Sequence, residues 1–195
     1  MKMILASKNE GKVKEFRQIL EKFNIELLSL KDLNFDGEIL EDGLSFEENS
    51  LIKAKAIYTK YGIPTIADDS GICVDALNGE PGIYSARSGD LNTDIDRRNL
   101  LLKNMIDIQE RSAYFHCSII LYLSKDNFKH FEGRVYGILD YEAKGDNGFG
   151  YDPIFIPNGY DISFGQLSDE IKNEISHRAL AMKSLIEFLE NDFNI

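Results

Sequence analysis

Residues 65–77 read Thr-Ile-Ala-Asp-Asp-Ser-Gly-Ile-Cys-Val-Asp-Ala-Leu. An apolar β-strand begins over 65–67, and the extended pattern resumes over 72–77. Between the two, Asp68-Asp69-Ser70-Gly71 predicts a tight turn. Apolar flanks predict that the segment is buried, and buried carboxylates are costly unless a cation or a hydrogen-bond donor compensates them. A divalent cation with oxygen ligands is one such compensation. The alternative is a turn that faces solvent, and this segment alone does not decide between that turn and a buried cation site.

The segment before this strand predicts a helix. Residues 45–48, Ser-Phe-Glu-Glu, form a capping box with Ser45 as N-cap. Gly62 and then Pro64 end the helix in the usual way. The predicted buried stripe consists of Leu51, Ala54, Tyr58 and Tyr61.

The N-terminal residues predict a strand, a polar loop and a second helix. The strand covers 3–6, the loop covers 7–12, and apolar residues recur at helical spacing from Val13 to Phe23. A helix N-terminus offers free backbone N–H groups to a phosphate, and Lys8 and Lys12 add positive charge. The loop has a single glycine, so it is not a P-loop. A solvated connection without a ligand is the alternative.

The rest of the chain alternates the two element types. A helix is predicted from a Thr93 cap to residue 105, then a hairpin of strands 114–123 and 128–140, a strand over 153–156, and helices over 168–173 and after Ser176. In the last helix, Ala181, Leu185 and Phe188 form the predicted inner face. Glycines at 133 and 137 in the second hairpin strand suggest a bulge or a close approach. The predicted class is α/β with a mixed sheet, in one domain over residues 1–195.

Composition excludes several classes of protein. The chain has 195 residues, 43% hydrophobic and 28% charged, which fits a globular protein and not a disordered one. A net charge of −11 disfavours binding to nucleic acid. No apolar run approaches the ~18 residues of a membrane span. Cys73 and Cys117 lie in apolar runs, so we expect buried free thiols in the cytoplasm or another reducing compartment, a disulfide being the minor alternative.

Two further segments carry candidate ligand contacts. Glycines on both sides of Phe149 leave its ring open to a flat ligand, although a core position beside a glycine turn is the alternative. His177 and Arg178 follow the predicted cap Ser176, where cations oppose the helix dipole. Two cations in that place suggest an anionic or acceptor-rich ligand, unless both are solvated.

Together these segments resemble the inosine triphosphate pyrophosphatases, also called dITP/XTP diphosphatases. The resemblance runs from about residue 3 to residue 190, with its motifs in order. The matching segments are LASKNEGK (5–12), SFEENSLIKAKA (45–56, resembling SFxENAxxKA), IADDSG (66–71), PGIYSAR (81–87), GFGYDPIF (148–155) and KNEISHR (172–178). Residues 164–167, Phe-Gly-Gln-Leu, depart from the Ala-Glu-Leu or Ala-Glu-Met that is common there.

The resemblance implies Mg²⁺-dependent hydrolysis of ITP, dITP or XTP to the monophosphate and pyrophosphate. It implies a long mixed sheet with two α/β lobes, an active-site cleft between them, and a homodimer with a small nucleotide as substrate and no nucleic-acid or membrane partner. Asp69 would be the general base, Lys53 a second catalytic residue, and Glu41 and Asp69 the metal ligands with Asp68 close by. The implied substrate contacts are Ser7, Lys8, Asn9, Glu10, Gly11, Lys12, Lys53 and Ser70, and, toward the nucleoside, Phe149, Gly150, Tyr151, Asp152, Lys172, His177 and Arg178.

Two rival functions stay open at this point. A pyrophosphatase of the Maf type would use similar acids and lysines, but neither the His177–Arg178 pair nor Phe149 is expected there. A nucleotide sensor without catalysis would lack one of the acids or lysines, and the sequence shows no such loss.

Overall fold

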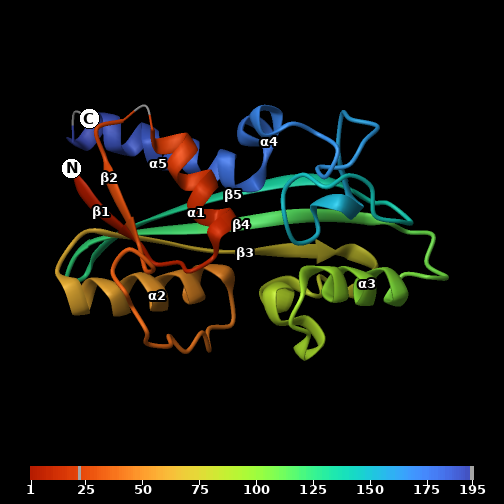
Figure 1. The fold of residues 1–195 in the computed structure, drawn as a ribbon, viewed down its shortest axis with the longest axis horizontal. Coiled ribbons are helices and arrows are strands. Elements are labelled where there is room, and N and C mark those ends of the chain that lie inside the picture. The colour runs from red at the N-terminus through yellow and green to blue at the C-terminus, as the bar shows by residue number, and fades with distance from the viewer. Residues whose placement is uncertain (22, 194–195) are drawn as a thin grey trace. The chain divides into compact units, whose positions relative to one another are not determined.

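The computed structural model describes residues 1–21 and 23–193. Within these residues the strands form one mixed sheet in the order β2-β1-β3-β4-β5-β6 (Figure 1). β1 (Lys2–Leu5) runs parallel to β2 (Glu26–Ser29) and to β3 (Thr65–Val74). β5 (Asn127–Leu139) and β6 (Phe155–Pro157) are antiparallel. The α/β class and the mixed sheet predicted from the sequence are confirmed.

The chain divides into two compact units. Unit 1 contains the described residues of 1–69, 117–133 and 179–193, and unit 2 contains residues 70–116 and 134–178. The boundary in β3 falls between Asp69 and Ser70.

Unit 1 packs helices on both faces of its strands (Figure 1). Met3 and Leu5 of β1 point to the core shared with α1 (Glu10–Leu20) and α5 (His177–Phe193). Ile4, between them, points to the core shared with α2 (Phe46–Tyr61). This alternation follows from the two-residue period of a strand. Within unit 1 the same alternation directs Ile66 of β3 to the α1 side and Ala67 to the α2 side.

Unit 2 has its own apolar core. Ile72 and Val74 of β3 pack with α3 (Asp94–Asn104), with β4 (Ser112–Ser124) and with the end of β5. Phe155 of β6 contacts Phe115 edge-on, with ring centroids 4.8 Å apart. Short 3-10 turns lie at Asp75–Leu77, Gly82–Asp90 and Asp152–Ile154, and α4 spans Asp169–Ile175.

Most predicted elements are confirmed. Ser45, Thr93 and Ser168 cap α2, α3 and α4 through their side chains. β4 and β5 are neighbours joined by a two-residue turn, as a hairpin requires. Gly137 marks a close approach, because an added Cβ would lie 2.1 Å from the Ile156 carbonyl oxygen.

Four local features differ from the predictions. β2 was not predicted, and the last strand covers 155–157 because residues 152–154 form a 3-10 turn. The predicted loop ends early, since α1 begins at Glu10. In α2 the apolar stripe is offset: of the four predicted residues only Ala54 is fully buried. The buried residues of this helix are Phe46, Asn49, Ser50, Lys53, Ala54 and Ile57.

Both cysteines are buried free thiols, as predicted. None of the helices formed by the described residues has the length and apolar character needed to cross a membrane.

Candidate active site

The four residues Asp68-Asp69-Ser70-Gly71 continue β3 without interruption, so the predicted turn is wrong. Asp68 is 2% exposed and Asp69 8% exposed, which also excludes the solvent-facing alternative. β1 pairs with β3 only as far as Leu5 and Ile66, so both acids lie just past the carboxyl end of a parallel strand. Ligands commonly bind beyond the carboxyl ends of parallel strands.

The two carboxylates point to opposite faces of β3. Asp69 lies on the α2 face and Asp68 on the α1 face, as the strand period requires. The composition Asp-Asp-Ser-Gly is typical of turns, but here the segment stays in a strand because each acid has a lysine partner on its own face.

On the α2 face, Asp69 meets two side chains from one helix. Asn49 Nδ2 donates to Asp69 Oδ2 at 3.1 Å, and Lys53 Nζ lies 3.6 Å from Asp69 Oδ1. Asn49 and Lys53 are four residues apart, which places them on the same side of α2. Lys53 Nζ also donates to Glu41 Oε2 at 2.8 Å. Two acids therefore flank a single buried ammonium.

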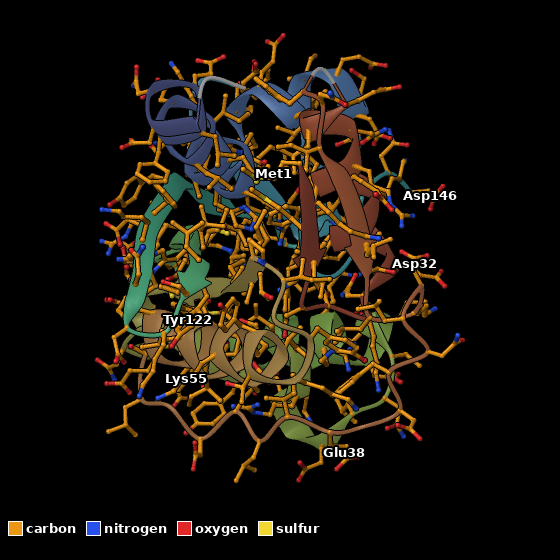
Figure 2. All side chains as sticks on the ribbon, turned by 90° about the vertical axis from the view of Figure 1, so that its left-hand side faces the viewer. Met1, Asp32, Glu38, Lys55, Tyr122 and Asp146 are labelled. Atoms are coloured by element: carbon orange, nitrogen blue, oxygen red, sulfur yellow. The ribbon has the colours of Figure 1, made fainter. Side chains whose placement is uncertain are left out.

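The loop that carries Glu41 is attached to the start of α2. Gly43 N donates to Asn49 Oδ1 at 3.0 Å, and Leu44 N donates to Glu48 Oε2 at 2.6 Å. The predicted capping box is present in part, since Ser45 Oγ accepts from Glu48 N at 3.1 Å. The segment before α2 runs alongside that helix (Figure 1), and Lys55, labelled in Figure 2, is on the exposed side of the helix. One helix thus positions Glu41, Asn49 and Lys53.

On the α1 face, Lys12 Nζ forms an ion pair with Asp68 Oδ2 at 2.9 Å. Lys12 stands in the first turn of α1, whose N-cap is Asn9: the Asn9 side chain accepts from Lys12 N at 3.1 Å. Ser7 Oγ accepts from Asn9 N at 3.1 Å. Ser7 and Asn9 therefore shape the start of the helix that delivers Lys12, and Gly11 lies half-buried in the same turn.

Two other residues at the start of α1 and just before it point elsewhere. Lys8 Nζ donates to the Gly37 carbonyl at 3.1 Å and lies 5.4 Å from the centroid of the Phe35 ring. Glu10 is exposed and pairs with Lys31. Neither side chain contacts Asp68 or Asp69 in this structure.

The buried charges shift one another's titration. Burial raises the pKa of Asp69 above its ordinary value, and this effect outweighs the positive charges of Lys53 and Lys12. Burial lowers the pKa of Lys53, but the negative charges of Asp69, Glu41 and Asp68 more than offset it, so its pKa is also raised. Lys53 is therefore a stable ammonium, whereas the Asp69 carboxylate is held in an unfavourable environment. Such perturbed groups are typical of functional sites.

The acids suit a hard divalent cation. In the part of the chain that the structure describes, no three His, Cys, Asp or Glu side chains form a preformed metal site. Mg²⁺ needs fewer protein ligands, because it combines one or two carboxylates with substrate phosphates and waters. Glu41 and Asp69 already converge on one positive charge, and oxygen is the donor type that this cation prefers. The donor set therefore fits the ion.

A second polar group lies in unit 2. Asp152 Oδ2 accepts from Lys172 Nζ at 2.7 Å and from Phe149 N at 2.8 Å, and Asp152 and Lys172 are both buried. Lys172 Nζ lies 4.8 Å from the centroid of the half-buried Phe149 ring, and Arg178 Cζ lies 5.7 Å from it. Arg178 Nη2 donates to Ser70 Oγ at 2.9 Å. Phe149 does not belong to the apolar core of unit 2.

His177 and Arg178 are not solvated, so that alternative is wrong. Arg178 is 1% exposed, and His177 stacks on Phe115 with centroids 4.7 Å apart. α5 begins at His177, directly after Ser176. A histidine and an arginine buried at a helix start need hydrogen-bond acceptors close by. The Ser70 hydroxyl oxygen is one such acceptor for Arg178.

Gly150 and Tyr151 contribute to the shape of the same loop. Gly150 N donates to Asp94 Oδ2 at 2.9 Å. Tyr151 is a core residue whose hydroxyl donates to the Ser85 carbonyl at 2.9 Å, and burial raises the pKa of Tyr151 to about 12.

Sequence patterns did not assign roles to Asn49 or Asp94. Asn49 was detectable in principle, since a polar residue one turn before Lys53 shares its buried side of the helix. Asp94 gave no comparable signal, because an acid in the first turn of a helix is ordinary.

Comparisons with known proteins cover nearly the whole chain. The sequence profile of the Ham1 family matches residues 3–188. A Bacillus licheniformis protein named dITP/XTP pyrophosphatase is 44% identical over 191 residues, covering 96% of this chain and 97% of the relative. The Staphylococcus aureus Ham1 protein has a similar structure, with a TM-score of 0.88 and 39% identity over 98% of this chain and all of that one. A HAM1 protein from Coxiella burnetii has a TM-score of 0.89 and 35% identity, covering 98% of this chain and 99% of that one.

Proposed function

The chain belongs to the Ham1 family, as the sequence motifs indicated, and we propose that it is a Mg²⁺-dependent pyrophosphatase of deaminated purine nucleoside triphosphates. Its substrates would be ITP, dITP and XTP, and its products the nucleoside monophosphate and pyrophosphate. Such an activity removes damaged nucleotides before polymerases use them. The relatives named dITP/XTP pyrophosphatase support the substrate class.

The observation that carries the proposal is the buried Asp69 between Asn49 and Lys53. Release of pyrophosphate requires water to attack the α-phosphorus while the bond from phosphorus to the pyrophosphate oxygen breaks. Asp69, whose pKa is raised by burial, is suited to accept the proton of that water. The Asn49 hydrogen bond fixes the direction in which its carboxylate points.

The remaining residues of this group would stabilise charge. Lys12 and Lys53 are buried or half-buried cations within 4 Å of the acids, so they can balance the negative charge of the leaving pyrophosphate. Glu41 and Asp69 would hold Mg²⁺, with Asp68 nearby. When bound, Mg²⁺ neutralises phosphate charge and orients the reacting groups.

The unit 2 group would bind a purine nucleoside. Phe149 offers a ring face for stacking, while Lys172, His177 and Arg178 supply donors. Hypoxanthine and xanthine carry an acceptor oxygen at C6, whereas adenine carries an amino donor there. A donor-rich group can hydrogen-bond to the C6 oxygen, whereas the adenine amino group would face another donor.

The family resemblance leads us to propose a homodimer in a reducing compartment such as the cytoplasm. The free thiols of Cys73 and Cys117 support the compartment. Sedimentation of the purified chain at two concentrations measures the dimer directly.

The substrate class is tested by pyrophosphate release from ITP, dITP, XTP, ATP and dUTP with Mg²⁺ present. We expect the three deaminated purines to exceed ATP and dUTP in kcat/KM by at least about 100-fold. Lys55→Met is a matched control for Lys53→Met, because both lysines lie on α2 but Lys55 is exposed. We expect only Lys53→Met to lose activity. A preference for dUTP would favour a pyrimidine house-cleaning enzyme, and tight ITP binding without turnover would favour a sensor.

A further inference from the structure

The loop that presents Phe149 has unusual backbone freedom. Gly148 and Gly150, on either side of the ring, have φ values of +74° and +61°. Glycine reaches this left-handed region at little cost but also visits many other conformations. A ring carried between two such residues needs anchors if it is to present one face in one place.

Local hydrogen bonds close the loop upon itself. Phe149 N donates to Asp152 Oδ2 at 2.8 Å, and Asp152 N donates to the Phe149 carbonyl at 3.2 Å. These bonds define the shape of the turn between the two residues. They do not involve Gly150, which is half-buried.

Gly150 is tied instead to a different element of unit 2. Its N–H donates to Asp94 Oδ2 at 2.9 Å across 56 positions of the chain. The other oxygen of Asp94 pairs with Arg97 one turn further along α3, and Arg97 Nη1 donates to the Leu91 carbonyl at 2.6 Å. Asp94 is thus held in place by its own helix while it accepts from the loop.

We infer that Asp94 is a positioning residue for nucleobase binding: it holds Gly150, and through it the Phe149 ring, in the orientation that stacks on the base. The choice of ligand rests on the proposed function. Asp94 is not expected to touch the nucleotide or the attacking water. Its loss should therefore weaken binding and leave the chemical step intact.

A purely structural role for Asp94 makes different predictions. An acid in the first turn stabilises a helix modestly through the dipole, whatever loop it contacts. Asp96 lies in the same turn and is also acidic, but its carboxylate accepts from Thr93 Oγ1 at 2.6 Å, within the cap of its own helix. Asp96→Ala is therefore the matched control for Asp94→Ala.

The experiment compares Asp94→Ala, Asp94→Asn and Asp96→Ala in ITP hydrolysis and in amide hydrogen exchange at Gly150. A charged hydrogen bond of this type predicts a rise of about tenfold in KM for Asp94→Ala, with kcat within about twofold. Asp94→Asn keeps an acceptor oxygen, so it should remain within about threefold of the wild type. Exchange at Gly150 should accelerate in Asp94→Ala only. Asp94→Ser, which suits a helix start, repeats the comparison if the alanine variant folds poorly.

Equal KM increases in Asp94→Ala and Asp96→Ala would overturn the inference, as would a loss confined to kcat or unchanged exchange at Gly150. Failure of the wild type to hydrolyse ITP would overturn the proposed function instead. In that case accelerated exchange at Gly150 still supports the link between Asp94 and the loop, and unchanged exchange still refutes it.

Discussion

Replacement of Asp69 by Asn should lower turnover by about 100-fold or more without destabilising the fold. The side chain is almost the same size, and its oxygen can still accept from Asn49 Nδ2, which lies 3.1 Å from Asp69 Oδ2. Lys53 would keep its closer partner, Glu41, at 2.8 Å. The variant therefore removes one negative charge from a buried site that retains a cation–anion pair.

The expected change in stability follows from two opposing quantities. Attraction between charges at 3.6 Å is roughly 4–5 kcal/mol at an effective dielectric constant near 20. Removal of a carboxylate from water costs several kcal/mol. Because the pKa of Asp69 is raised, the cost of burial exceeds the attraction. We therefore expect Asp69→Asn to have an equal or higher free energy of unfolding at pH 7, by up to about 1–2 kcal/mol.

The difference should also depend on pH in a definite direction. A carboxyl with a raised folded-state pKa contributes stability below its ordinary value of 3.8, and that contribution is lost as pH rises through the raised pKa. The Asn variant has no such loss. Its advantage over the wild type should therefore grow above about pH 4 and level off above the raised pKa.

Urea denaturation from pH 4 to pH 8 measures this difference, and ITP turnover measures the function. We expect kcat to fall by about 100-fold or more. If Asp69→Asn lost about 3–5 kcal/mol at pH 7, Asp69 would be a structural partner in an ion pair, and the reasoning would be refuted. Wild-type turnover in the folded variant would remove Asp69 from the reaction.

Three further results are expected. EDTA should abolish ITP hydrolysis and added Mg²⁺ should restore it, with Mn²⁺ a partial substitute; turnover in metal-free buffer would contradict the metal assignment. Arg178→Ala should reduce the preference for ITP over ATP in kcat/KM by about 1–3 kcal/mol. Phe149→Ala should weaken the binding of both nucleotides alike. If Arg178→Ala also lowered kcat/KM equally for ITP and ATP, base recognition would lie away from Arg178. Tyr151→Phe should lose about 1 kcal/mol at pH 7 with its bond to Ser85. Since the pKa of Tyr151 is about 12, the stability from its hydroxyl is complete below pH 10 and lost as pH rises through 12, so urea unfolding should show the two proteins converging there.

Helix starts were the features that the sequence predicted best. Ser45 and Thr93, the predicted caps of two helices, each accept a backbone N–H as their positions required. These signals are local, because a cap and its donor lie three residues apart or fewer. The hairpin of β4 and β5 was predicted for the same reason, from two β-rich runs and a short polar turn.

Features that depend on distant partners were not predictable from local patterns. The Asp68–Gly71 segment has the composition of a turn, but it is a strand because α1 and α2 bring lysines to its two faces. The buried side of α2 was placed one residue off, since apolar periodicity does not detect a face built from Asn49, Ser50 and Lys53. The family resemblance grouped Lys53 with Asp69, but it did not predict that Asp68 and Asp69 point to opposite faces of the strand.

Identification of the products tests the central claim most directly. Phosphorus NMR of ITP incubated with the enzyme and Mg²⁺ distinguishes cleavage at the α-phosphorus from cleavage at the γ-phosphorus. The account predicts inosine monophosphate and pyrophosphate in equal amounts, and the same incubation with Asp69→Asn should leave most of the ITP uncleaved. Inosine diphosphate with inorganic phosphate, or intact ITP with the folded wild-type protein, would contradict it.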